Sequence, residues 1–166
     1  MAIDTVVEDR GVFGGVEDRI FEGGGREYTL SLLYRDSGDS RYGGSYAVVA
    51  HTDIVEVDGV EVGVRSVEVG NVLGRYFPEY PSPRTPSTEI HRIDVDEEHR
   101  RLGLATAMLD MFYDTLPDGT KITMRSKAKD TVRRLKHMLE TVGFDMVYSW
   151  KGLEERKIYF ITALRG

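Results

Sequence analysis

Apolar and polar residues alternate over short segments of the N-terminal half, a pattern typical of β-strands. Residues 26–35 are rich in β-branched and aromatic side chains and predict one strand. A polar, turn-rich segment follows at residues 36–44. Residues 46–57 and 60–69 alternate valine with polar residues and predict two further strands. We therefore expect the first half of the chain to be mainly β-sheet.

A hairpin is the most specific local prediction in this half. Asp58-Gly59 lies between the two alternating valine segments, which is typical of a two-residue type I′ turn. This register places Val57 opposite Val60 and Glu56 opposite Glu61. Because acidic side chains directly opposite one another repel, we expect the face that carries them to be exposed.

The second half alternates strands with helices. The helical segments have apolar residues at three- to four-residue spacing, and Gly143 stands where a helix C-terminus is expected. In order, the expected segments are strand 89–95, helix 105–114, strand 121–125, helix 130–141, and strands 144–151 and 156–164. The order from residue 89 onward is therefore β-α-β-α-β-β.

Two segments are expected to lack regular structure. Residues 1–25 are glycine-rich and predict an irregular, loosely attached arm with one strand at most. Residues 77–86 contain four of the five prolines, and proline removes a backbone donor from a helix or a central strand. We interpret this second segment as a loop whose aromatic residues could line a groove.

Composition narrows the class of protein. A chain of 166 residues with 40% hydrophobic and 30% charged residues is expected to form a single globular domain, residues 1–166. No cysteine is present, which excludes disulfides and thiolate ligands, and the four histidines lack metal-ligand spacing. The N-terminal sequence has no basic or apolar leader and no apolar run reaches membrane length, so we expect a cytoplasmic protein without a membrane partner.

Charge is unevenly distributed along the chain. The net charge of −6 argues against a general nucleic-acid-binding role and is compatible with an amine-bearing substrate. The segment 121–136 is nevertheless strongly basic, with Asp130 as its one acidic residue. Such an excess could bind a phosphorylated ligand or could be a solvated helix face, and the sequence leaves both interpretations open.

The junction between strand 89–95 and helix 105–114 is the strongest functional signal. Arg100-Arg101-Leu102-Gly103-Leu104-Ala105 carries two arginines and one glycine immediately before the helix. The first backbone N–H groups of a helix have no intrahelical partner, and the helix dipole makes this end attractive to anions. Gly103 allows close approach of a phosphate, and Ala105 keeps the first turn small.

This Arg-x-x-Gly-x-Ala pattern resembles motif A of the GNAT N-acetyltransferase superfamily. Residues 135–144, which end in Gly-Phe, resemble motif B of the same superfamily, and a predicted strand lies between the two motifs. The resemblance covers roughly residues 87–164. It implies an α/β (α+β) fold with a mixed, mostly antiparallel sheet, flanking helices and a V-shaped splay between the fourth and fifth strands. The two helices that usually follow the first strand have no room in residues 36–44.

The resemblance implies that acetyl-coenzyme A (acetyl-CoA) is the co-substrate and that no metal is needed. The coenzyme pyrophosphate would bind the motif A loop, and its thioester carbonyl would meet backbone N–H groups of the preceding strand. Lys127 and Arg133 are candidates for its 3′-phosphate. The implied coenzyme residues of the strand and the loop are Ile93, Asp94, Val95, Arg100, Arg101, Leu102, Gly103, Leu104, Ala105 and Thr106.

Catalysis by such an enzyme requires a base for the acceptor amine. Glu89 stands six residues before Val95, where a branch of the superfamily carries its glutamate base. His91 has the same strand parity, and imidazole can accept a proton at neutral pH. The tyrosine that many members place four residues before the motif B glycine is replaced by Leu139.

The resemblance therefore implies an N-acetyltransferase that acetylates a peptide or small-molecule amine directly, as a monomer or homodimer. Two alternatives remain open at this point. One is an inert acyl-CoA-binding or regulatory module, which the absent tyrosine favours. The other is a GNAT-like enzyme that modifies nucleic acid through the basic segment, which would make binding strongly salt-dependent.

Overall fold

The computed structural model describes residues 16–39, 43–82, 85–126, 129–151 and 159–165. In chain order the elements are β1 (Arg19–Gly23), β2 (Arg26–Asp36), β3 (Gly44–Asp58), β4 (Glu61–Ser82), β5 (Thr85–Val95), the 3₁₀ turn η2 (Glu97–His99), α2 (Leu104–Thr115), β6 (Lys121–Ser126), α3 (Lys129–Val142), β7 (Phe144–Lys151) and β8 (Tyr159–Arg165). The order predicted from residue 89 onward is confirmed.

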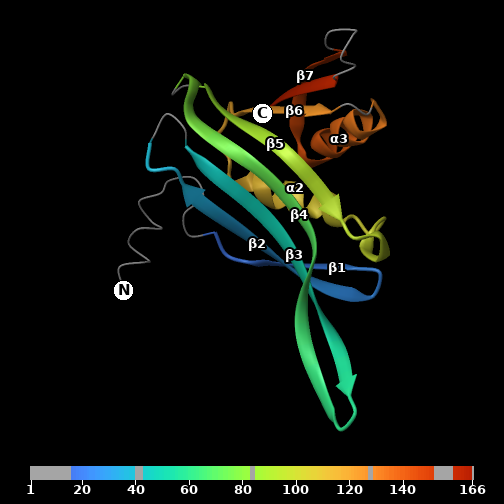
Figure 1. The fold of residues 1–166 in the computed structure, drawn as a ribbon. Helices are drawn as coiled ribbons and strands as arrows, with labels where there is room; N and C mark the ends of the chain where they lie inside the picture. The colour runs from blue at the N-terminus through green and yellow to red at the C-terminus, as the bar shows by residue number, and fades with distance from the viewer. Residues whose placement is uncertain (1–15, 40–42, 83–84, 127–128, 152–158, 166) are drawn as a thin grey trace.

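The strands form one mixed sheet with the order β1-β2-β3-β4-β5-β6-β8-β7. Every pair is antiparallel except β5 and β6, which are parallel. Figure 1 shows a strongly curved sheet with α2 packed behind its central strands and α3 beside the C-terminal ones. Within the described residues, both helices lie on one face and no helix covers the other face at β3 and β4.

The single parallel pair is also where the sheet splits. β5 pairs with β6 only over three register positions, from Ser87 opposite Lys121 to Glu89 opposite Thr123. β5 then continues to Val95 while still paired with β4. Among the strands that the structure describes, none pairs with residues 90–95 on the β6 side, so this edge of β5 is free there. This divergence confirms the predicted splay, which the structure places between β5 and β6.

The hairpin at Asp58-Gly59 is confirmed, but its predicted register is wrong by one residue. Asp58 pairs with Glu61 and Val57 pairs with Val62, so the two turn residues are Gly59 and Val60. Gly59 supplies the positive φ of +58°. Glu56 then lies opposite Gly63 instead of Glu61, and the acidic residues directly opposite one another are Asp58 and Glu61.

The proline-rich segment is more regular than predicted. β4 continues to Ser82 and β5 begins at Thr85, so most of residues 77–86 belong to strands. The pairing of β4 with β3 ends at Tyr76, and its register with β5 is irregular between Phe77 and Ser82. The prolines between these two residues are tolerated because no continuous ladder requires their backbone donors.

The N-terminal arm is also more firmly attached than predicted, as far as the structure describes it. Residues 19–23 form β1, which pairs with β2 at the edge of the sheet. Arg19 donates a 2.7 Å hydrogen bond to Asp114 of α2 and lies 3.9 Å from Asp110 on the same helix. The first 15 residues of the predicted arm lie outside the described residues.

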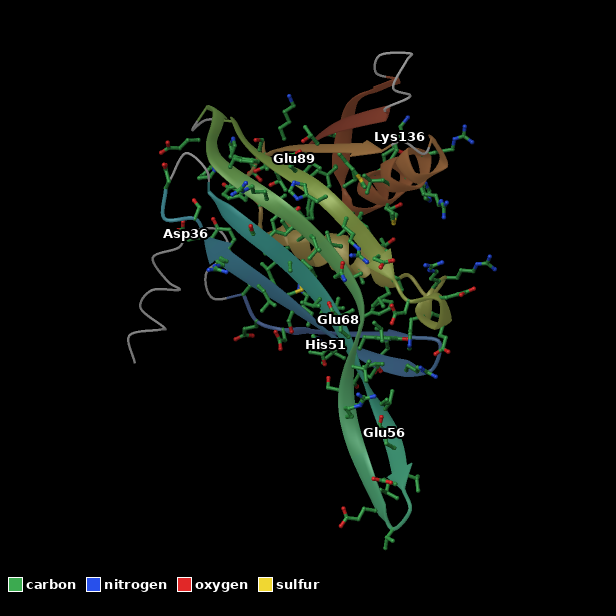
Figure 2. All side chains as sticks on the ribbon, viewed as in Figure 1. Asp36, His51, Glu56, Glu68, Glu89 and Lys136 are labelled. Carbon is green, nitrogen blue, oxygen red and sulfur yellow. The ribbon has the colours of Figure 1, made fainter. Side chains whose placement is uncertain are left out.

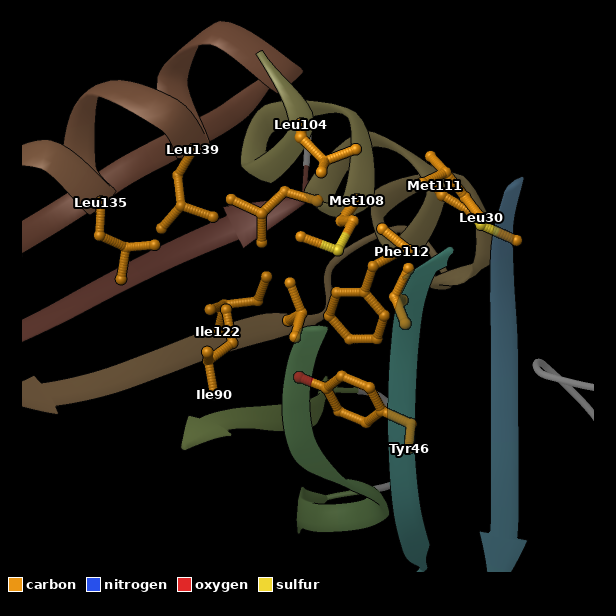
Figure 3. Packing of buried hydrophobic residues seen from close by; sticks show 14 of the residues in the cluster. Leu30, Tyr46, Ile90, Leu104, Met108, Met111, Phe112, Ile122, Leu135 and Leu139 are labelled. Atoms are coloured by element: carbon orange, nitrogen blue, oxygen red, sulfur yellow. The ribbon is translucent and has the colours of Figure 1, made fainter. Parts of the chain in front are cut away.

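The hydrophobic core lies between α2, α3 and the strands in front of them. Met108, Leu109, Met111 and Phe112 present the apolar face of α2 and are fully buried. Figure 3 shows the ring of Phe112 over that of Tyr46, and their centroids are 4.1 Å apart. This packing fixes the position of α2, and therefore of the loop before it, against β3 and β4. No helix within the described residues is long and apolar enough to cross a membrane.

Candidate functional site

The loop between β5 and α2 has the geometry expected of an anion site. Gly103 precedes the helix with φ +86° and ψ +11°, and Arg101 also has a positive φ of +63°. The first intrahelical bond in the loop runs from the N–H of Ala107 to the carbonyl of Gly103. No side chain caps the helix and no acidic residue lies in its first turn. The N–H groups of the first turn, from Leu104 to Thr106, therefore lie at the positive end of the helix dipole without a capping side chain or an acidic residue of that turn.

Some side chains of this loop are buried and anchor it to the rest of the protein, and others are exposed to solvent. Leu104 is buried in the core. Leu102 lies against Gly23 and Gly24 of the β1–β2 turn, and Phe21 of β1 lies near Gly103. The N-terminal strand therefore supports the predicted coenzyme loop, a role that the glycine-rich composition did not indicate.

The two arginines of the loop are exposed, as a phosphate-binding role would require. The Nε of Arg100 donates a 2.7 Å hydrogen bond to the carbonyl of Val95, which holds its guanidinium beside the end of β5. The buried His99, which immediately precedes Arg100, accepts or donates a 2.8 Å hydrogen bond with the phenol of Tyr28. This contact ties η2 to β2 and limits movement of the loop.

Glu89 and His91 lie together on β5, as predicted. The Nε2 of His91 is 3.8 Å from a carboxylate oxygen of Glu89, and both side chains are partly exposed. Thr88 and Ile90 are buried, so Glu89 points to the face without helices (Figure 2). His91 occupies a β-bulge, because Ile90 pairs with Gly74 while Arg92 pairs with the preceding Leu73. Bulges commonly re-aim side chains next to active sites.

Tyr46 is a neighbour of Glu89 that sequence reasoning missed. It lies opposite Gly74 in the β3–β4 register, and a side chain at Gly74 would collide with both the Tyr46 phenol and the Glu89 carbonyl. Burial, and secondarily the negative charge of Glu89, raises the pKa of Tyr46 well above its ordinary value. The phenol is therefore protonated across the neutral range. The sequence signal for this close approach is Gly74, a single glycine within a segment that otherwise reads as a strand.

Three buried polar atoms on β4 and β5 have no hydrogen-bond partner within the described residues. They are Asn71 Oδ1, Arg75 Nε and Thr88 Oγ1. Arg75 lies directly opposite Glu89, and its guanidinium is 5.9 Å from the ring centre of Phe77. Buried groups of this kind are rare except where a ligand or water completes their bonding. Of the three residues, Arg75 extends the candidate site from β5 onto β4, whereas Asn71 lies opposite Asp94.

The remaining predicted residues contribute in different ways. Ile93 and Val95 pack their side chains against the core and present backbone to the splay. Arg92 donates a 2.7 Å hydrogen bond to Asp94, which lowers the pKa of that carboxyl group below its ordinary value. The Asp94 side chain is therefore already engaged by its own strand.

The predicted 3′-phosphate residues are the least defined part of the site. Arg133 is exposed near the start of α3. Lys127 lies outside the described residues. No cluster of three or more metal-ligating side chains occurs in the part of the chain that the structure describes.

Comparison with known families identifies one match. The profile of the "Acetyltransferase (GNAT) family" matches residues 28–144. The match begins well before the predicted 87–164 segment, because it also includes β2, β3 and β4. No curated protein sequence matches the chain.

Solved structures with a similar fold share little sequence with this chain. Arabidopsis thaliana NAA60 in complex with a bisubstrate analogue has a TM-score of 0.50 and 13% identity, covering 82% of this chain and all of that one. Arabidopsis thaliana Naa50 with a bisubstrate analogue has a TM-score of 0.48 and 13% identity, covering 70% of each chain. A spermidine N-acetyltransferase chimera from Vibrio cholerae and hSSAT has a TM-score of 0.46 and 15% identity, covering 82% and 97%.

Proposed function

Because the chain belongs to the acetyltransferase (GNAT) family and is thereby an acyltransferase, we propose that it transfers the acetyl group of acetyl-CoA directly to an amine. The observation that carries this proposal is the uncapped N-terminus of α2 beside the splay between β5 and β6. The N-terminus of α2 suits a pyrophosphate. The splay provides the free backbone edge that a pantetheine arm and a thioester require. The two features are joined by only eight residues, 96–103.

The loop would hold the donor through its backbone. The N–H groups from Arg101 to Thr106 would bind the pyrophosphate, with Arg100 and Arg101 adding positive charge. The pantetheine amides would pair with the free edge of β5 at residues 90–95. A backbone N–H near residues 93–95 would polarise the thioester carbonyl.

The acceptor would approach over the face of the sheet that carries Glu89. Its nitrogen must lose a proton to attack the thioester carbon, and Glu89 would accept this proton directly or through a water held with His91. The new C–N bond forms as the C–S bond breaks, and the thiolate of coenzyme A leaves. The neutral Tyr46 phenol lies on the other side of the same backbone and would help to hold the Glu89 segment in place.

The partly buried Arg75 places one positive charge opposite Glu89 on the neighbouring strand. This pairing suits an amine acceptor that also carries a polar or anionic group, as peptides and many small amines do. The acceptor class is accordingly a peptide or small-molecule amine.

A binding module without catalysis is the second candidate function, and one observation favours it. Leu139 occupies the position where the family resemblance implies a tyrosine acid, and it is fully buried in the core. A catalytic protein would have to release the thiolate without this acid.

The two functions are separated by one experiment in two steps. Mass spectrometry of ligands released from the purified protein should identify coenzyme A or an acyl derivative. Steady-state release of free coenzyme A from acetyl-CoA is then measured with a panel of peptide N-termini, lysine peptides and small amines. Turnover with any acceptor supports the transferase. Tight coenzyme binding without turnover across the panel would favour the inert module, and absence of coenzyme binding would refute both.

A further inference from the structure

Arg75 of β4 and Glu89 of β5 lie directly opposite one another in the sheet, yet they do not form an ion pair. Side chains at such positions share one face of the sheet, and their Cβ atoms are about 4.5–5.5 Å apart, which allows an arginine and a glutamate to pair. Within the described residues, neither Glu89 nor any other carboxylate forms a hydrogen bond or an ion pair with Arg75. The positive charge of Arg75 therefore has no counter-charge among these residues.

The two charged groups point in opposite directions along the sheet. The Glu89 carboxylate lies 3.8 Å from the Nε2 of His91, two residues further along β5. The Arg75 guanidinium lies 5.9 Å from the ring centre of Phe77, two residues further along β4. Because the strands are antiparallel and Phe77 pairs with Ser87, these two neighbours lie on opposite sides of the Arg75–Glu89 pair. The acidic and the basic group are therefore separated along the sheet.

The unpaired state of Arg75 is unfavourable because this side chain is partly buried. Its Nε is covered by protein and has no hydrogen-bond partner within the described residues. A cation that loses water without gaining an acceptor is destabilised, and an anion that binds it restores the lost interaction. Glu89 lies on the helix-free face of the sheet (Figure 2), so a ligand reaches the pair without displacing a described helix.

We propose that the acceptor is zwitterionic, with its amine at Glu89 and His91 and a carboxylate bound by the guanidinium of Arg75. This inference rests on the proposed acetyl transfer and narrows its acceptor to amines that also carry a carboxylate. The acetyl group moves to the amine, and the carboxylate takes no part in bond making. Arg75 is thereby a specificity residue, because it selects the acceptor and positions its nitrogen beside the base.

The spacing and the charge of the pair define the acceptor further. Arg75 and Glu89 belong to adjacent strands, so the carboxylate must lie within a few bonds of the amine. One positive and one negative group match a molecule with one charge of each sign, whereas a phosphate dianion would be repelled by Glu89. A free amino acid fits this chemistry, and so does a peptide with an acidic side chain next to its N-terminus.

Matched acceptors test the role of Arg75. The kcat/KM of acetyl transfer is measured for glycine and β-alanine and for their amides, and the selectivity is the ratio of acid to amide. Arg75→Gln should lower this ratio at least about tenfold, as expected for loss of one charge-assisted contact. Comparing the ratio between wild type and variant cancels the different basicities of the amines and any loss of folded protein.

Arg35→Gln is the matched control. Arg35 is an exposed arginine in the same register row, because Ser45 of β3 pairs with Arg75 on one side and with Arg35 on the other. It lies two strands from Arg75, about 9–10 Å away, and its variant should keep the wild-type ratio. An unchanged ratio in Arg75→Gln would show that Arg75 acts on turnover or folding alone and would overturn the proposal. An equal fall in Arg35→Gln would also overturn it.

Peptides distinguish the two sources of the carboxylate. C-terminally amidated peptides that begin with Gly-Glu or Gly-Gln are compared in the same way. A fall in selectivity confined to the free amino acids would assign a small-molecule acceptor, and one confined to the peptides would assign an acidic N-terminus. Selectivity that is independent of Arg75 in both series would overturn the zwitterionic acceptor.

Equilibrium binding separates this inference from the proposed reaction. Isothermal titration measures the affinity of the wild type and of Arg75→Gln, each with coenzyme A added, for β-alanine and its amide. Arg75-dependent binding of the acid without acetylation of any amine would support the ligand assignment and refute the reaction. Acetylation of amines with no Arg75-dependent preference in either measurement would support the reaction and overturn the ligand assignment.

Discussion

The phenol of Tyr46 lies in the space that a side chain at Gly74 would need, and the backbone carbonyl of Glu89 borders the same space. The absence of a side chain at Gly74 therefore allows Tyr46 to pack close behind the strand that carries the candidate base. The glycine is required here because of crowding, since it is absent from the residues with positive φ.

Replacing Gly74 with alanine should destabilise the protein. The new methyl group must displace Tyr46 or the β5 backbone, and overpacking of this kind costs about 1–3 kcal/mol. Urea unfolding measures the loss. Gly63→Ala is the matched control, because no atom lies within 4 Å of its added carbon. Tyr46→Phe should restore part of the stability of Gly74→Ala by removing the colliding oxygen, and equal unfolding of the two alanine variants would contradict the close approach.

Stability should fall at alkaline pH because of Tyr46. Burial and the charge of Glu89 raise the pKa of Tyr46, so above pH ~10 the unfolded chain loses a phenol proton that the folded chain retains. The stabilising effect of keeping this phenol neutral is complete below that pH and declines above it. Relative to Tyr46→Phe, the wild type should lose up to about 1.4 kcal/mol of unfolding free energy per pH unit. Parallel stability profiles of the two proteins would contradict the assignment.

The helices and the glycine loop before α2 could be predicted because their signals are local. A glycine and a proline-containing turn mark the ends of α2 and α3, and Gly103 adopts the positive φ that its place before a helix suggests. The surroundings of the candidate base Glu89 could not be predicted in the same way. The bulge at His91 depends on the pairing of β5 with β4, and the contacts of Tyr46 and Arg19 join segments far apart in sequence.

Gly103→Val should greatly weaken coenzyme A binding. The nearest atom to an added carbon is 3.6 Å away, so the constraint at Gly103 is its φ of +86° and not lack of space. A β-branched residue would force the loop out of this conformation and misalign the N–H groups from Arg101 to Thr106. Isothermal titration with coenzyme A measures the effect.

Gly119→Val is the control for this backbone strain. Gly119 has φ +79°, also with open space around it, but it lies in the turn after the opposite end of α2. Both variants should lose similar stability, and only Gly103→Val should lose affinity. Equal affinities of the two variants would show that the α2 N-terminus does not bind the pyrophosphate.

The basic segment should discriminate between coenzyme A and dephospho-coenzyme A. If Lys127 or Arg133 meets the 3′-phosphate, the dephospho form should bind about 5–30-fold more weakly, as expected for one charge-assisted contact. Arg133→Ala or Lys127→Ala should abolish the difference. Lys136→Ala, an exposed control on the same helix as Arg133, should preserve it. Equal affinity of the wild type for the two ligands would show that the basic segment is a solvated surface and does not bind the 3′-phosphate.

Glu89→Gln should lower kcat by about 10²–10⁴-fold, the usual contribution of a general base, with little change in acetyl-CoA affinity. The loss should shrink at high pH, where more of the acceptor amine is already neutral. Glu68→Gln, which changes an exposed glutamate of β4 opposite His51, should retain full activity.

The role of His91 determines whether Glu89 or the histidine itself accepts the proton of the amine. The 3.8 Å contact with Glu89 allows the histidine either to help hold a water or to accept the proton itself. In the first case His91→Ala should cost less than Glu89→Gln, and in the second case the ranking should reverse. The pH dependence of kcat/KM for each single variant distinguishes the two. Near-full turnover of both variants across neutral pH would exclude both residues as the base, because the amine would then have to arrive deprotonated and the enzyme would contribute only positioning and backbone polarisation.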